Sequence, residues 1–178
     1  TNRLSRRARI RKMSLSFDGV DDQVSMGDVT IVDGATQLTA SFWLNLTSNV
    51  NGRIITKWGD LTADECFLIS LEGSGDEIQF AAKNGVSPFG LQLKNTSAAN
   101  LVVGTWYHVA VTFTAPTTVA IYVNGVSQAL TTTLNGDVPS LQNTGTSLQI
   151  GYETDEAAVP IIGLISHMQL FTVSLDAN

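Results

Sequence analysis

Short runs in which apolar and polar residues alternate recur along almost the whole of this 178-residue chain, with turn-forming residues between them. The clearest run, residues 106–113, alternates Tyr107, Val109, Val111 and Phe113 with Trp106, His108 and Ala110. Successive side chains of a β-strand point to opposite faces of a sheet, so a period of two predicts a strand with one buried face. Because such runs recur with turns between them, the chain is predicted to be all-β.

Similar runs predict the other strands of the domain. Together the predicted strands cover residues 13–17, 38–46, 54–58, 66–71, 78–82, 89–93, 106–113, 119–123, 126–130, 148–152 and 161–171. Asn124-Gly125 lies between two of them and favours a type I′ hairpin, which needs positive φ at both central residues. We expect about eleven or twelve strands in a two-sheet antiparallel β-sandwich, with no helix and no internal repeat.

The charges divide the chain into an N-terminal arm, residues 1–12, and a sandwich domain, residues 13–178. The arm holds six basic residues and no acid, whereas the rest of the chain holds the other four Lys and Arg and all 16 Asp and Glu. The basic residues of the arm are Arg3, Arg6, Arg7, Arg9, Arg11 and Lys12. Such an arm favours an anionic partner, and the acidic flank of a neighbouring protein subunit is one that would suit it.

Other partners and locations are less consistent with the composition. The anionic body would repel nucleic acid and anionic membranes, and no aromatic residue interleaves the arm to stack on bases. We see neither a signal peptide nor a run of apolar residues long enough to span a membrane. Cys66 is the only cysteine, so no disulfide can form within the chain, which favours synthesis in a reducing compartment such as the cytoplasm.

Six segments follow one another in an order typical of a known family. They are LSFDGVDDQV (15–24), LTASFWL (38–44), WYHVAVTF (106–113), IYVNG (121–125), LQIG (148–151) and IGLI (162–165). In this order and spacing they resemble the laminin-G-like jelly-roll domain of the concanavalin A-like lectin/glucanase superfamily. The resemblance covers residues 14 to about 175 and implies two antiparallel sheets with a concave and a convex face.

The resemblance leaves the function open. Relatives include lectins, adhesion modules, enzyme accessory domains and structural parts of larger assemblies. Many of them carry an acidic pair after the closing strand motif, where this chain has Ser166-His167. Roles of acids at that position therefore do not carry over to this chain.

The resemblance also implies a structural calcium ion near the first turn. Asp18, Asp21 and Asp22 cluster there beside a glycine, and Ca²⁺ takes six to eight oxygen ligands, carboxylates among them. The alternative is that Asp18 caps the turn through the backbone while the other two carboxylates are solvated. A second acidic loop, residues 153–156, is a weaker candidate for the same ion.

A glycan site needs an exposed aromatic platform and nearby hydrogen-bonding groups. Trp43 and Trp106 lie in strands that resemble family strands, so we expect both in the core. Trp58 lies at the end of a predicted strand before Gly59 and Asp60, so Trp58 and Asp60 are the candidate ligand-binding residues.

Catalysis is not expected. No predicted strand carries the alternating carboxylates that strand-borne glycosidases use as acid and base or nucleophile. His108 lies in mid-strand among apolar residues, where a packed or hydrogen-bonded structural role is expected. Cys66 begins a strand and is expected to be a small buried residue rather than a reactive thiol.

Two functions remain. The first is a structural or decorating subunit of a large assembly, such as the surface of a virus or phage particle, anchored by the basic arm. The alternative is a carbohydrate-binding or adhesion module at the cell surface or outside the cell, with calcium as a candidate structural ion. The absence of an export signal and of a disulfide, together with the basic arm, favours the assembly subunit.

Overall fold

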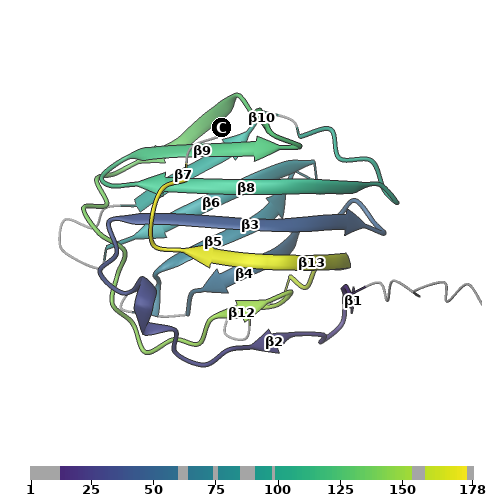
Figure 1. Ribbon diagram of the computed structural model, residues 1–178, viewed down its shortest axis with the longest axis horizontal. Helices are drawn as coiled ribbons and strands as arrows, with labels where there is room; N and C mark the ends of the chain where they lie inside the picture. Colours follow the sequence, from purple (N-terminus) through teal and green to yellow (C-terminus); the bar gives the residue numbers. More distant parts are fainter. Residues whose placement is uncertain are drawn as a thin grey trace, which may run out of the picture.

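A computed structural model of the protein describes residues 13–59, 64–73, 76–84, 91–97, 99–153 and 159–175. Within these residues the chain forms two antiparallel sheets of six and seven strands, which confirms the predicted β-sandwich. In Figure 1 strands β13, β3, β8 and β9 lie nearer the viewer and cross over the fainter strands of the other sheet. The N-terminal arm, residues 1–12, lies outside the described residues.

The six-stranded sheet has the order β1-β13-β3-β8-β9-β10. Its strands are β1 (Leu15–Asp18), β13 (Ile162–Phe171), β3 (Gln37–Leu46), β8 (Trp106–Thr114), β9 (Thr118–Val123) and β10 (Val126–Ser127). The seven-stranded sheet has the order β11-β7-β6-β5-β4-β12-β2. Its strands are β11 (Leu130–Asn135), β7 (Leu91–Thr96), β6 (Glu77–Lys83), β5 (Phe67–Glu72), β4 (Gly52–Lys57), β12 (Gln149–Ile150) and β2 (Val24–Ser25).

The described residues include the 3₁₀ turn Thr30–Val32 and form no α-helix. None of their helical segments has the length and apolar character needed to cross a membrane. The strand count of thirteen exceeds the expected eleven or twelve because β11 and β2 are not among the predicted strands, and β2 is only two residues long. Strands this short leave almost no alternating pattern in the sequence.

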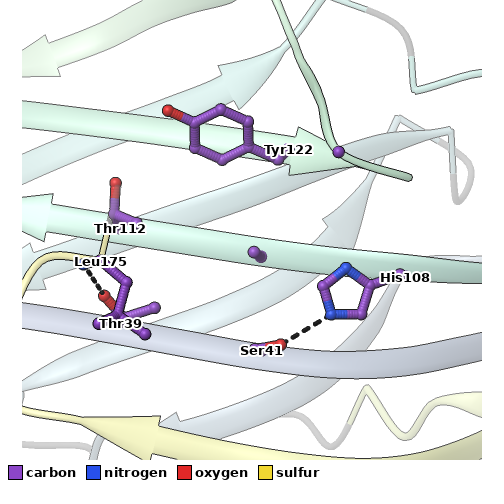
Figure 2. Close-up of a pocket in the computed structure, with 8 residues that line it drawn as sticks. Thr39, Ser41, His108, Thr112, Tyr122 and Leu175 are labelled. Atoms are coloured by element: carbon purple, nitrogen blue, oxygen red, sulfur yellow. Dashed lines mark hydrogen bonds between the residues drawn. The ribbon is translucent and has the colours of Figure 1, made fainter. Parts of the chain in front are cut away.

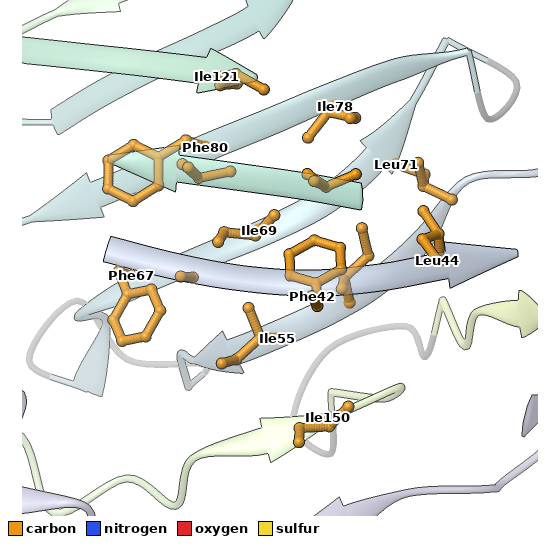
Figure 3. Close-up of a cluster of buried hydrophobic side chains, with 14 of the residues drawn as sticks. Phe42, Leu44, Ile55, Phe67, Ile69, Leu71, Ile78, Phe80, Ile121 and Ile150 are labelled. Carbon is orange, nitrogen blue, oxygen red and sulfur yellow. The ribbon is translucent and has the colours of Figure 1, made fainter. Parts of the chain in front are cut away.

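The core lies between the two sheets, as the alternation predicts. Leu38, Ala40, Phe42, Leu44 and Leu46 of β3 are all at most 2% exposed and point to the same side. Figure 3 shows Phe42 and Leu44 among the buried side chains contributed by both sheets. Burial of this continuous apolar layer supplies most of the stabilisation of such a sandwich.

The return strand after the Asn124-Gly125 turn differs from the prediction. The turn itself has the expected positive φ angles of 51° and 77°. The predicted strand over residues 126–130 ends after Ser127, because the chain then crosses to the other sheet. Gln128 still donates its backbone N–H to Ile121 in β9, whereas the carbonyl of Ala129 already accepts from Ser97, just after β7. The next strand, β11, therefore pairs with β7 at the edge of the seven-stranded sheet.

A buried ion cluster attaches the segment between β2 and β3 to β4. The Lys57 side chain is fully buried, and its Nζ lies 2.6 Å from Asp28 Oδ1 and 2.8 Å from Asp33 Oδ1. Burial lowers the pKa of Lys57, but hydrogen bonds to the two carboxylates and their charges outweigh it and leave the pKa raised. The ammonium also donates to the carbonyl of Thr144. The lysine thus stays charged and holds three segments together.

Candidate functional site

The six-stranded sheet has one face toward the core and one away from it, which we call the open face. On β3 the open face carries Thr39, Ser41 and Trp43, the positions between the buried ones. Trp43 is 40% exposed, so the expectation that it lies in the core is wrong. The physical reason is that successive side chains of a strand point to opposite faces. The even-numbered residues of β3 face the core, so Trp43 faces away from it.

Trp43 and His108 form an aromatic pair at the centre of the open face. They are direct cross-strand partners in β3 and β8, and their ring centroids lie 5.4 Å apart at an interplanar angle of 61°. This edge-to-face arrangement is favourable for aromatic side chains. The pair holds the indole in place with much of its surface open to solvent, as a stacking platform requires.

His108 also contacts a hydroxyl beside the platform. Its Nε2 lies 2.9 Å from Ser41 Oγ, and the hydrogen bond is drawn as a dashed line in Figure 2. The expectation of a packed or hydrogen-bonded histidine is therefore confirmed. The same residue is bound through its backbone to the hairpin turn, because its N–H donates to Asn124 Oδ1 at 2.9 Å.

A shallow hollow of about 210 Å³ lies on the open face beside His108. Figure 2 shows Thr112 on β8, Tyr122 on β9 and Leu175 from the C-terminal segment around it. Leu175 is held there because Thr39 Oγ1 accepts from its N–H and donates to the carbonyl of Val173. The hollow is lined by Thr39, Ser41, His108, Ala110, Thr112, Tyr122, Gly125 and Leu175.

The open face thus combines an indole, a phenol, an imidazole and several hydroxyls. Neither Ser41 nor Tyr122 was among the site residues predicted from the sequence. Alternation could have placed Ser41 beside Trp43, since they are two residues apart on one strand. Tyr122 needed knowledge of the β8–β9 register, in which it lies opposite Ala110.

The other two tryptophans are half-buried. Trp106 begins β8 on the same face as Trp43, and Trp58 follows the end of β4. Among the tryptophans Trp43, not Trp58, is therefore the large exposed side chain. Asp60, the expected partner of Trp58, lies outside the described residues, so a ligand site at Trp58 and Asp60 stays a prediction.

The acidic turn after β1 is compact. Asp18, Asp21 and Asp22 are exposed, and one carboxylate oxygen from each lies within 4.8 Å of the others. Asp18 caps the turn, as in the alternative to a calcium site, since its Oδ1 accepts from the N–H of Val20 at 2.9 Å. Asp22 Oδ2 accepts from the N–H of Asp18 at 3.0 Å. The geometry fits both a self-capped turn and a shared cation, so calcium binding here stays a prediction.

The first residue of the second acidic loop has a structural role. Glu153 is 2% exposed, and its Oε2 lies 2.6 Å from Arg53 Nε, while Arg53 also reaches Glu72 at 3.1 Å. Residues 154–158 lie outside the described residues.

The Ser166-His167 pair lies at a β-bulge of β13, where His167 has a φ of 51° and Ser166 is paired with Trp43.

Fold and site together define a lectin-like β-sandwich. The chain belongs to the concanavalin A-like lectin/glucanase superfamily, because the family model of laminin G type matches residues 18–178. The resemblance identified from the sequence is therefore confirmed. No curated protein matches the chain.

Solved structures of similar shape confirm the fold. The sialidase carbohydrate-binding module of Ruminococcus gnavus, bound to α2,3-sialyllactose, has a TM-score of 0.64 at 14% identity and covers 93% of this chain and 94% of its own. Domains LG4-5 of the mouse laminin α1 chain have a TM-score of 0.62 at 13% identity. The match covers 92% of this chain and 43% of the laminin chain. The ligand-binding domain of botulinum neurotoxin serotype D, in complex with N-acetylneuraminic acid, has a TM-score of 0.62 at 12% identity. The match covers 92% of this chain and 40% of the toxin chain. This chain spans less than half of the last two.

Proposed function

We propose that this chain is a non-catalytic glycan-binding module whose binding site is the open face around Trp43. The observation that carries the proposal is the exposed indole held by His108 next to a mainly apolar hollow whose lining includes the hydroxyl-bearing residues Thr112 and Tyr122. A pyranose ring has one face of C–H groups that stacks on an aromatic ring, while its hydroxyls seek hydrogen-bonding partners. Both kinds of group are present side by side here.

Similar proteins support this choice. Two of the structural neighbours are described with a bound sialylated sugar or sialic acid, although their sequence identity is low enough to establish only a common fold. The glycan proposal for this chain therefore depends on its own residues, and the neighbours show only that the fold is used in this way.

The described residues of the site include no acid and base pair for hydrolysis. The strands of the six-stranded sheet carry no Glu and a single Asp, Asp18 at the end of β1. A glycosidase needs two carboxyl groups at the scissile bond. The Ser41–His108 contact has the distance of a nucleophile and base, but these strands offer no carboxylate to orient the imidazole. These features support binding without catalysis.

The test is a glycan array probed with the full chain and two single variants. Trp43→Ala is expected to weaken binding at least about ten-fold, which corresponds to 1.4 kcal/mol. Trp58→Ala serves as the matched control and is expected to leave binding unchanged. Loss of binding on Trp58→Ala alone would instead place the ligand at Trp58 and Asp60. Unchanged melting temperatures would show that both variants are folded.

An assembly subunit is the second candidate function. The observation in its favour is the division of charge between the basic arm and the acidic body. The described chain begins next to β13, where the carbonyl of Met13 accepts from Ser166 Oγ at 2.5 Å, so the arm joins the domain at this edge of the six-stranded sheet. On this proposal the arm anchors the domain to a neighbouring subunit, such as one in a virus particle, and the open face is displayed.

A further inference from the structure

The six-stranded sheet is almost free of charge. Its six strands contain no Lys, Arg or Glu, and their one Asp is Asp18 at the edge. The polar groups that it offers on the open face are hydroxyls, an imidazole and the amide of Gln169, which is exposed and paired with Ser41. A surface of this kind recognises hydrogen-bonding groups without a charge contribution.

Every Lys and Arg of the described chain lies on the other sheet. Arg53 and Lys57 are in β4, Lys83 is in β6 and Lys94 is in β7. Arg53 contacts the carboxylates of Glu72 and Glu153. Lys57 contacts those of Asp28 and Asp33, and Lys83 contacts that of Glu65. Packed sheets are about 10 Å apart, so these cations cannot reach a ligand on the open face.

Among the described residues, an anionic sugar would therefore find no counter-charge on the open face. Removing a carboxylate or sulfate from water is costly unless a cation or several N–H donors replace the water, and Arg is the usual partner. The domain also carries all 16 acids of the chain against four Lys and Arg, so its field repels anions.

A neutral sugar meets none of these costs. One uncharged ring can stack on Trp43 and direct hydroxyls toward Ser41 and His108. The hollow of about 210 Å³ is smaller than the ~300–1,000 Å³ of sites that enclose drug-sized ligands, so it suits a single sugar unit rather than a long chain.

We propose that the open face selects neutral glycans and discriminates against sialylated, sulfated and uronic-acid glycans. This inference rests on the proposed glycan-binding function and names the ligand class of that site. Selection arises from the neutral strands of the six-stranded sheet and from the placement of the cations on the opposite sheet.

The experiment is an array of neutral oligosaccharides, each matched with a sialylated or sulfated derivative, probed with the full chain. We expect at least one neutral member to bind, its anionic partner to bind at least about ten-fold more weakly, and the neutral affinity to change little with salt. Equal or tighter binding of the anionic partners would overturn the selectivity but leave the glycan function intact. Binding to no member would overturn the glycan function.

A gain-of-charge variant tests the cause of the selectivity. Gln169→Lys puts a cation on the open face and is expected to improve binding of the anionic derivatives several-fold in low salt. Thr133→Lys puts the same charge on exposed β11 of the other sheet and is the matched control. Equal effects of the two variants would show that overall charge, not the open face, determines ligand choice.

Discussion

At the scale of single residues, two buried groups show how the interior treats ionisable side chains. Cys66 is fully buried, as expected, and burial raises the pKa of its thiol to about 12. Lys57 lies close enough to influence that thiol, yet it stays charged because two carboxylates surround its ammonium. A thiol of this kind has a structural role and is not a nucleophile at neutral pH.

The raised pKa of Cys66 predicts alkaline destabilisation. Above pH 9, its ordinary pKa, the thiol ionises in the unfolded chain but not in the folded one, so stability falls by about 1.4 kcal/mol per pH unit. The raised pKa of Lys57 lowers the stability further above pH 10.5, because the folded state keeps the ammonium protonated to a higher pH than the unfolded chain does. Urea unfolding at a series of pH values measures both.

The control for this prediction is Cys66→Ala. The substitution should remove the loss of stability that begins near pH 9 and retain the loss that begins above pH 10.5. Each protein is compared with its own free energy of unfolding at neutral pH. An identical onset in the two proteins would contradict the assignment to Cys66.

At the scale of secondary-structure elements, the turns and edges carry the features that distinguish this chain. The hairpin turn between β9 and β10 bounds the hollow through Gly125, whose φ of 77° an L-residue with a side chain adopts only with strain. The turn after β1 brings three carboxylates together. The β-bulge of β13 lies opposite the platform at Trp43, in the position where relatives carry acids.

Calcium binding at the turn after β1 is tested by thermal melting. If the three carboxylates share Ca²⁺, saturating calcium raises the melting temperature by several degrees over a chelator, because about 100-fold excess over Kd adds about 2.7 kcal/mol. Asp21→Asn should abolish most of the shift, whereas Asp137→Asn, at an exposed acid elsewhere, should not. Identical melting in calcium and chelator would leave the turn as a self-capped structure.

At the scale of the whole molecule, charge is separated in two ways. The arm is basic and the domain is acidic. Within the described domain, Lys and Arg occur on the strands of the seven-stranded sheet, and the six-stranded sheet is nearly neutral. The first separation suits anchoring to an anionic surface, and the second suits recognition of an uncharged ligand, so the two proposed functions use different parts of the molecule.

Deletion of residues 1–12 tests the anchoring role. The truncated chain should be a folded monomer on a sizing column, because the core lies within residues 13–175. If the arm anchors the protein, only the full chain should join an assembly. A full-length variant with the six basic residues of the arm changed to Gln separates charge from length. Unchanged assembly by both variants would contradict the anchoring role.

Local alternation was enough to predict most of the strands, the face that β3 buries and the hairpin at Asn124-Gly125, since these depend on neighbours within a few residues. Alternation along β3 accounts for the exposure of Trp43, whereas resemblance to a family strand does not determine which face a side chain occupies. The crossing at Gln128, the cluster around Lys57 and the hollow beside His108 could not be predicted locally. Each joins segments far apart in the chain, and long-range packing, not local pattern, determines such contacts.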